Sequence, residues 1–235
     1  PRAGRKKNGY RIFTDFHMEQ TKFVRIALKV EFLGNGLRKQ AIIIIKTAAL
    51  GEFSEAIYLT QCYLQQIRNA QKNAEEAIVI TKKLLSGDNQ KINTTFLTRK
   101  KVADYLHISM DTLRNWETNG LLTIKRKQNG YRVYTDEDIR RLKIIRTLRY
   151  ANYSLSSILR MLNTLSRNPE ADIRQVIDTP NANDDIISAC DKLLTSLYYA
   201  EQNAKAMLSH LDKNFIEKNI VFDNGMEIRN LAAVL

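Results

Sequence analysis

The chain has 235 residues, of which 44% are hydrophobic and 26% are charged, and this composition is ordinary for a globular protein of one or two domains. Its longest apolar run covers residues 41–45, far short of the ~20 residues of a membrane span, and no hydrophobic segment follows the basic N-terminus as in a signal peptide. Its 2 cysteines exclude a disulfide framework, and its 9 glycines and 3 prolines disfavour a loop-rich all-β fold, so we expect a cytoplasmic protein.

The net charge of +12 is distributed unevenly along the chain. Residues 1–46 carry +8, residues 47–93 are neutral, residues 94–151 carry +7 and residues 152–235 carry −3. A concentrated basic block is typical of proteins that bind a polyanion such as nucleic acid. The alternative interpretation is a solvated surface, because net charge bears on partners and not on fold.

The first predicted element is a β-hairpin within the string RKKNGYRIFTD of residues 5–15, and nearly the same string, RKQNGYRVYTD, occupies residues 126–136. Eight of the eleven positions are identical, and the three exchanges are conservative or polar. The Asn-Gly pair is a strong signal for a two-residue turn between extended segments. Chance is a poor explanation for this repetition, which predicts two copies of one module.

The first copy continues as a helix whose apolar residues are Phe23, Val24 and either Ala27 or Leu28, and a long helix is predicted over residues 53–85. Within the long helix, AQKNA at residues 70–74 matches AEQNA at residues 200–204. The similarity between the two halves of the chain therefore extends well beyond the hairpins.

A helix-turn-helix is predicted in the middle of the chain. Residues 99–106 carry an apolar stripe typical of a short helix, and residues 107–109 form a tight turn. Ser109 is the expected N-cap of the second helix, and Trp116 is expected to face the core. Gly120 suits the left-handed conformation that ends a helix.

A second hairpin is predicted over residues 121–135, where extended residues flank Asn129 and Gly130. A hairpin attached to a helix pair is a wing, so this part of the chain is expected to be a winged helix-turn-helix. A helix resumes at Asp136, and a shorter one is predicted over residues 156–166.

The last predicted element is a long helix over residues 186–211. Its apolar residues recur at alternating spacings of four and three, the pattern of a two-helix coiled coil. A helix of this length spans roughly 39 Å and must meet a partner. The seam consists of Ile186, Cys190, Leu193, Leu197, Ala200, Ala204, Met207 and Leu211, and a weaker seam in the earlier long helix includes Tyr63, Ile67, Ala70 and Ala74.

The strings TLRNWETNGLL at residues 112–122 and GYRVYTDEDIRRLKIIRTL at residues 130–148, followed by the long helix, resemble the MerR family of bacterial transcription regulators. Trp116 stands where many members have a tyrosine, and Lys125 stands near a common proline or arginine. The resemblance covers residues 95–213, with a partial second copy over residues 1–86 that lacks its helix-turn-helix in this sequence.

The resemblance implies a mostly helical fold with small β-hairpin wings, in which a winged helix-turn-helix and a long antiparallel coiled-coil helix occur in two tandem copies. The expected parts are a first module over residues 1–86, a linker over 87–95, a second winged helix-turn-helix with its helical pair over 96–183, a coiled-coil helix over 184–214 and a C-terminal tail over 215–235.

The second helix of a helix-turn-helix enters the major groove of DNA, and basic wing residues neutralise phosphates beside it. On this basis the expected base contacts come from Ser109, Met110, Thr112 and Asn115, and the expected backbone contacts come from Lys100, Arg114, Arg126, Lys127, Tyr131 and Arg132. Arg99 and Asn129 are further expected DNA-binding residues. By resemblance, Arg5, Lys6, Asn8, Tyr10 and Arg11 of the first wing are expected to act in the same way on a second half-site.

Several of these residues have a purely structural alternative. Arg114 could pair with Asp111 or Glu117, Tyr131 could be a packing residue, and Lys100 could be merely solvated. The coiled coil could likewise pair the two long helices of one chain, as a pseudo-dimer, or the equivalent helices of two chains, as a homodimer.

The resemblance implies double-stranded DNA and RNA polymerase as partners, operator bending or untwisting as the mode of action, and a small-molecule effector as an open question. Metal sensing is not expected, because Cys190 lies on the coiled-coil seam and residues 212–235 contain no Cys or His that could join it as ligands. The three histidines share no ligand spacing. No catalytic constellation or phosphate-binding loop occurs, so neither an enzyme nor a cofactor is expected. The alternative functions are a DNA-bending recombination accessory factor of the excisionase type and a protein-interaction module.

Overall fold

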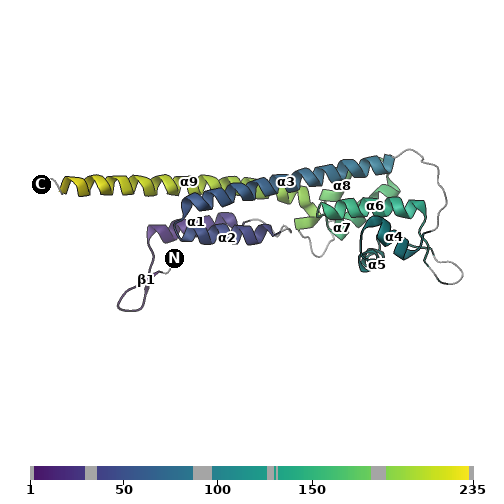
Figure 1. The fold of residues 1–235 in the computed structure, drawn as a ribbon, viewed down its shortest axis with the longest axis horizontal. Coiled ribbons are helices and arrows are strands. Elements are labelled where there is room, and N and C mark those ends of the chain that lie inside the picture. The colour runs from purple at the N-terminus through teal and green to yellow at the C-terminus, as the bar shows by residue number, and fades with distance from the viewer. Residues whose placement is uncertain are drawn as a thin grey trace. The chain divides into compact units, whose positions relative to one another are not determined.

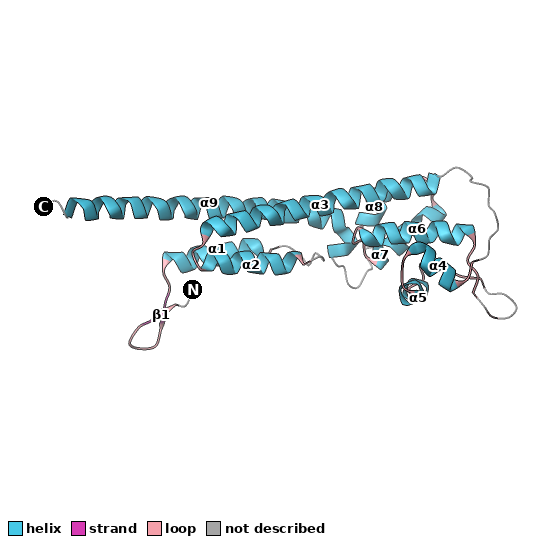
Figure 2. Cartoon of the chain, viewed as in Figure 1, coloured by secondary structure: helices cyan, strands magenta, loops and turns pink. Residues whose placement is uncertain are grey.

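Figures 1 and 2 show a computed structural model of the chain, which describes residues 3–29, 36–86, 97–125, 130, 132–180 and 189–232, without the side chains of 189, 190 and 214–232. Helices dominate, and the one sheet among the described residues has two antiparallel strands (Figure 2). The elements in chain order are β1 (Gly4–Arg5), β2 (Arg11–Ile12), α1 (Asp15–Ala27), α2 (Leu37–Ala49), α3 (Phe53–Ser86), α4 (Arg99–Leu106), α5 (Met110–Thr118), α6 (Asp136–Tyr150), α7 (Leu155–Arg167), α8 (Ile173–Asp178), the 3₁₀ helix η1 (Ala189–Lys192) and α9 (Leu193–Ala232).

The chain divides into two compact units. The first unit combines Pro1–Asn69 with Ser196–Leu235, and the second unit consists of Ala70–Thr195. The sequence instead predicts a boundary at residue 86, where the first long helix ends. The difference arises because α3 contributes its first half to one unit and its second half to the other.

In the first unit, β1 and β2 form a short hairpin in which Gly4 pairs with Ile12 and Arg5 with Arg11. The turn contains Gly9, whose φ of 84° lies in the left-handed region that glycine adopts without steric cost. Helix α1 follows directly and packs on α2, where the side chain of Gln20 donates a hydrogen bond of 3.1 Å to the carbonyl of Ala48.

Helix α9 also belongs to the core of the first unit. Its His210 ring stacks on Phe23 of α1 with a centroid separation of 5.6 Å, and its Nε2 lies 3.2 Å from the carbonyl oxygen of Glu19. On the neighbouring helix α3, Arg68 forms an ion pair of 3.2 Å with Glu201 of α9.

The first half of α3 and α9 lie side by side in this unit and run in opposite directions (Figure 1). Their facing side chains are buried, and several are small, which allows close approach of the two helices. Ala70 is only half-buried, unlike the residues around it in the weaker seam. The buried side chains are Ala56, Thr60, Tyr63 and Ile67 on α3, and Leu197, Ala200, Ala204, Met207 and Leu211 on α9.

In the second unit, the remaining half of α3 contacts α8 and the residue Tyr153 that precedes α7. Arg174 of α8 forms an ion pair of 2.7 Å with Glu75, and the buried hydroxyl of Tyr153, just before α7, donates a hydrogen bond of 3.4 Å to the carbonyl of Ala74. Burial raises the pKa of Tyr153 well above its usual range. Ala77 and Thr81 are also buried on this face of α3.

The predicted helix over residues 186–211 differs from the observed one at both ends. Helix α9 begins at Leu193, because the carboxylate of Asp178 accepts hydrogen bonds from the backbone N–H groups of Leu194 at 2.8 Å and Thr195 at 3.1 Å. It continues to Ala232, so most of the segment predicted as a tail is helical. Ile186 lies outside the described residues, and Cys190 lies in η1.

The two wings are followed by helices with the same type of N-cap. Thr14 precedes α1, and its N–H lies 3.1 Å from Nδ1 of His17; Thr135 precedes α6, and its N–H donates to the carboxylate of Asp138 at 2.8 Å. Each threonine thus forms a capping box, which satisfies N–H groups that the first turn of a helix leaves unpaired. Within the described part of the chain, no helix is both long enough and apolar enough to cross a membrane.

Candidate nucleic-acid interface

Helices α4 and α5 form a helix-turn-helix whose boundaries follow from local signals. His107 adopts a positive φ of 50° and ends α4, and the hydroxyl of Ser109 accepts a hydrogen bond of 3.0 Å from the N–H of Thr112 at the start of α5. Gly120, with a φ of 76°, ends the segment. The buried side chains that join the two helices are Val102, Ala103, Leu106, Leu113 and Trp116.

The outer face of α5 carries the residues that the sequence predicts as base contacts. Ser109, Met110 and Asn115 are exposed, whereas Thr112 is half-buried and its hydroxyl lies 2.9 Å from that of Ser109. The amide oxygen of Asn115 accepts a hydrogen bond of 2.7 Å from Asn119. This contact engages the amide oxygen of Asn115, a role for Asn119 that the sequence does not reveal.

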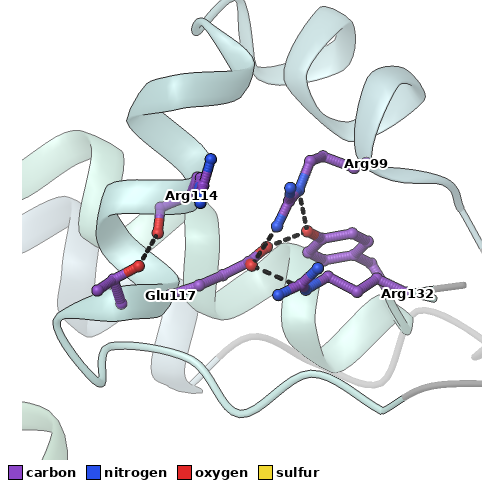
Figure 3. A network of polar contacts seen from close by, with 6 residues as sticks. Arg99, Arg114, Glu117 and Arg132 are labelled. Carbon is purple, nitrogen blue, oxygen red and sulfur yellow. Dashed lines mark hydrogen bonds and ion pairs between the residues drawn. The ribbon is translucent and has the colours of Figure 1, made fainter. Parts of the chain in front are cut away.

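Arg114 lies on the same exposed face of α5. Its carbonyl accepts a hydrogen bond of 2.9 Å from Thr118, but among the described residues its guanidinium has no ion-pair partner. Figure 3 shows no contact between this guanidinium and Glu117, so the alternative in which Glu117 neutralises Arg114 does not occur here.

Glu117 instead joins both helices to the wing (Figure 3). Its carboxylate accepts hydrogen bonds from Arg99 at the start of α4 and from the hydroxyl of Tyr134, and it forms an ion pair of 3.1 Å with Nε of Arg132. Tyr134 also pairs through its backbone with Leu97, the two N–H···O bonds measuring 3.1 and 3.0 Å. We call Arg99, Glu117, Arg132 and Tyr134 the wing clamp.

Within the wing clamp, the pKa values of Tyr134 and of Arg99 are raised. Burial, together with the hydrogen bond to Glu117, raises the pKa of Tyr134 to about 12. The hydrogen bond with Tyr134 is the largest cause that raises the pKa of Arg99 above its usual value. Both groups therefore keep their protons at neutral pH, and the clamp contains two guanidinium ions around one carboxylate.

The structure adds a contact to Arg99 and Arg132 that the sequence does not predict. Both are expected from the sequence to contact DNA, and in the structure each is paired with Glu117. Arg99 is the less exposed of the two, its side chain being 26% exposed against 37% for Arg132. Lys100, next to Arg99, is exposed, in keeping with either of its two predicted roles.

Helix α6 is fixed to the end of the helix-turn-helix by Arg141. Its Nε donates a hydrogen bond of 2.6 Å to the carbonyl of Leu121, and burial lowers its pKa. The flank of the second wing is closed by a bond of 3.1 Å from the N–H of Val133 to the carbonyl of Lys125. Four predicted contact residues of this wing, Arg126, Lys127, Asn129 and Tyr131, lie outside the described residues.

All five predicted contact residues of the first wing are exposed, namely Arg5, Lys6, Asn8, Tyr10 and Arg11. The hairpin is held by a bond of 2.8 Å between the N–H of Lys6 and the carbonyl of Tyr10, and Arg5 donates to the carbonyl of Gly9 at 3.3 Å. The hairpin therefore presents its basic side chains to solvent.

The two wings differ in how they are covered. Tyr134 is fully buried, whereas Phe13, which occupies the same place in the repeat, is 64% exposed. Ile12 and Val133 show the same contrast. The difference arises because α4 and α5 cover the second wing, and no equivalent pair of helices lies in the described part of the first unit.

No group of three or more His, Cys, Asp or Glu side chains that could hold a metal ion occurs among the residues whose positions are described.

Comparison with known proteins identifies the region that contains this site. Residues 97–165 match the family of MerR HTH family regulatory proteins. The HTH-type transcriptional regulator ZntR of Escherichia coli, from strain K12 and from O157:H7, is 34% identical over 64 residues, which are 27% of this chain and 45% of the relative. The chain therefore spans about half the length of the curated relatives that it matches.

A crystal structure of HiNmlR, described as a MerR family regulator lacking the sensor domain and bound to promoter DNA, aligns with 57% of this chain and 94% of its own at 24% identity. The TM-score is 0.29, too low to bear on the arrangement of the whole chain. The family match, the identity to ZntR and the observed α4–α5 pair instead agree on one region. Residues 97–165 therefore form a helix-turn-helix domain of the MerR type.

Proposed function

We propose that this chain is a sequence-specific DNA-binding transcription regulator of the MerR type. The observation that carries the proposal is the outer face of α5, where Met110, Arg114 and Asn115 are exposed on a helix-turn-helix of the MerR family. Such a helix reads base edges in the major groove, and a wing beside it contacts phosphates. The +7 charge of residues 94–151 favours the same partner.

We also propose that one chain imitates a dimer, with two tandem modules that face two unlike half-sites. Three features support this proposal: the repeated hairpin strings, the threonine cap that follows each wing, and the composition of the first unit. That unit combines the first module with α9, the long helix of the second half of the chain, as a coiled coil within one chain requires.

By resemblance to the family, the proposed regulator acts on a bacterial promoter in the cytoplasm together with RNA polymerase. Two DNA-contacting modules in one chain would bend or untwist an operator, and the cost of this deformation depends on the sequence between the half-sites. Specificity would then come partly from base pairs that the protein does not touch.

The proposed function is tested by selecting genomic DNA fragments that bind the purified chain, followed by footprinting and titration at several salt concentrations. Arg114→Ala is expected to lower the affinity for the selected fragment and for unrelated DNA by the same factor, because a phosphate contact is lost. The slope of log affinity against log salt concentration should fall in magnitude by about one. Arg114 pairs with no acidic residue among those described, so its loss leaves no carboxylate behind.

Lys72→Ala is the matched control for this test. Lys72 is an exposed cation on α3 that pairs with exposed Glu76 at 3.8 Å, so its removal changes the net charge by the same amount. Its affinity for DNA is expected to equal that of the parent. Equal binding by Arg114→Ala and the parent would show that α5 does not face DNA in the proposed way.

A further inference from the structure

We propose that Glu117 is a positioning residue for DNA binding, which holds the guanidinium of Arg132 by its Nε so that the two terminal nitrogens face a phosphate. The inference rests on the proposed function and adds to it a role for a carboxylate that does not itself touch DNA. A negative charge near a polyanion would thereby strengthen binding.

The contacts of the carboxylate support this role. Glu117 is only 9% exposed and lies 3.1 Å from Nε of Arg132, whose side chain is 37% exposed. Hydrogen bonds from Arg99 and Tyr134 hold the same carboxylate from its other sides (Figure 3). The acceptor for Arg132 is therefore fixed by groups on two separate segments of the domain, the start of α4 and the residues just before α6.

The chemistry of the guanidinium determines what remains available on Arg132. An arginine side chain carries five N–H donors in a rigid planar fork, and two parallel donors match the oxygens of a phosphate. Because Nε faces Glu117, the terminal nitrogens are left for another acceptor, and they have no recorded partner among the described residues. A lysine at this position would carry the same charge but could not bond a carboxylate and a phosphate in this planar geometry.

The first wing offers an internal contrast. Arg11 takes the place of Arg132 in the repeat, is exposed, and has no carboxylate partner among the described residues. Its side chain is therefore not preorganised, and fixing it on a phosphate costs conformational entropy that the wing clamp has already removed for Arg132.

For Glu117→Gln, the positioning role predicts a change in DNA affinity opposite to the change that net charge alone predicts. Glu117→Gln makes the chain more positive, so long-range attraction alone would tighten DNA binding. If Glu117 orients Arg132, the same change instead releases the guanidinium and weakens binding. Glu137→Gln is the matched control, because Glu137 is an exposed carboxylate on α6 and its replacement changes the net charge equally.

The experiment measures the affinity of the full chain for a mixed-sequence DNA duplex over a series of salt concentrations, with thermal unfolding recorded for each variant. Glu117→Gln is expected to bind several-fold more weakly than the parent with a salt slope lower by about one, whereas Glu137→Gln binds as tightly as the parent or more tightly. Arg132→Lys is expected to lose affinity to a similar extent although it keeps its charge.

Arg132→Lys leaves the buried carboxylate in place, so it decides the question even where Glu117→Gln proves unfolded in the thermal measurement. Parent-like affinity and slope in Arg132→Lys, or tighter binding in a folded Glu117→Gln, would overturn the positioning role. Absence of salt-dependent binding by the parent chain would instead contradict the proposed function itself.

Discussion

Replacement of Ile67 by alanine is expected to lower the free energy of unfolding by about 2–5 kcal/mol, one of the largest effects of any single truncation in the chain. Ile67 is fully buried where α3 faces α9 in the first unit. The truncation deletes three buried methyl or methylene groups. It leaves a cavity that the surrounding side chains fill only in part. Chemical denaturation followed by circular dichroism measures the loss.

Ile80→Ala is the matched control, because it makes the same chemical change on the same helix. Ile80 is 45% exposed, so its truncation is expected to change stability by about 0.5 kcal/mol or less. Equal losses in the two variants would mean that Ile67 does not lie in a packed seam, and the intramolecular coiled coil would then lack its energetic basis.

Replacement of Tyr134 by phenylalanine is expected to cost about 1.5–3 kcal/mol at neutral pH, the range for a hydrogen bond to a charged partner. The ring stays in its buried site, but Glu117 loses a donor and Nε of Arg99 loses the acceptor that lies 3.5 Å away. Tyr150→Phe is the control, since Tyr150 is 69% exposed, and it is expected to be nearly neutral.

The pH dependence of this effect follows from the raised pKa of Tyr134, about 12 in the folded chain against 10.0 for an unperturbed tyrosine. Above pH 10 the unfolded chain begins to release this proton while the folded chain keeps it, so the contribution of Tyr134 to stability falls as the pH rises toward 12. The difference between parent and Tyr134→Phe should be constant below pH 10 and shrink above it. A difference that grew with pH would contradict the assigned direction.

The helix-turn-helix is the part of the fold that the sequence predicts best, because its signals are local. The N-cap at Ser109, the inward-facing Trp116 and the glycine after α5 each act within a few residues, and all three appear as expected. The helix bounds of α4 agree with the predicted range for the same reason.

The wing clamp could not be predicted because its members come together only through tertiary packing. Glu117 is separated from Arg99 by 18 positions and from Tyr134 by 17. The sequence offers Glu117 as a partner for Arg114, its near neighbour on the helix, whereas the fold gives it to residues from α4 and the wing. Within the repeated strings, one exchange hints at the clamp: the first wing has Phe13 where the second has Tyr134, so only the second carries the hydroxyl that bonds Glu117.

The start and end of the long helix α9 are the second feature that the sequence predicts incorrectly. The heptad pattern predicts which residues are buried between α3 and α9, but it carries no information about where a continuous helix starts. That start depends on Asp178, a residue outside the pattern whose carboxylate caps the backbone of α9. The heptad spacing also predicts that Ala70 is buried, whereas it is half-buried in the structure. Its exposure depends on which side chains surround it and not on its position in the heptad.

One chain is proposed to supply both halves of a DNA-binding unit, and the mass of its complex with DNA distinguishes this arrangement from a homodimer. Light scattering on the purified complex with a selected operator fragment should give the mass of one duplex plus a single chain of 27.1 kDa. A complex that contains two chains per duplex would contradict the claim and assign the pairing to a homodimer.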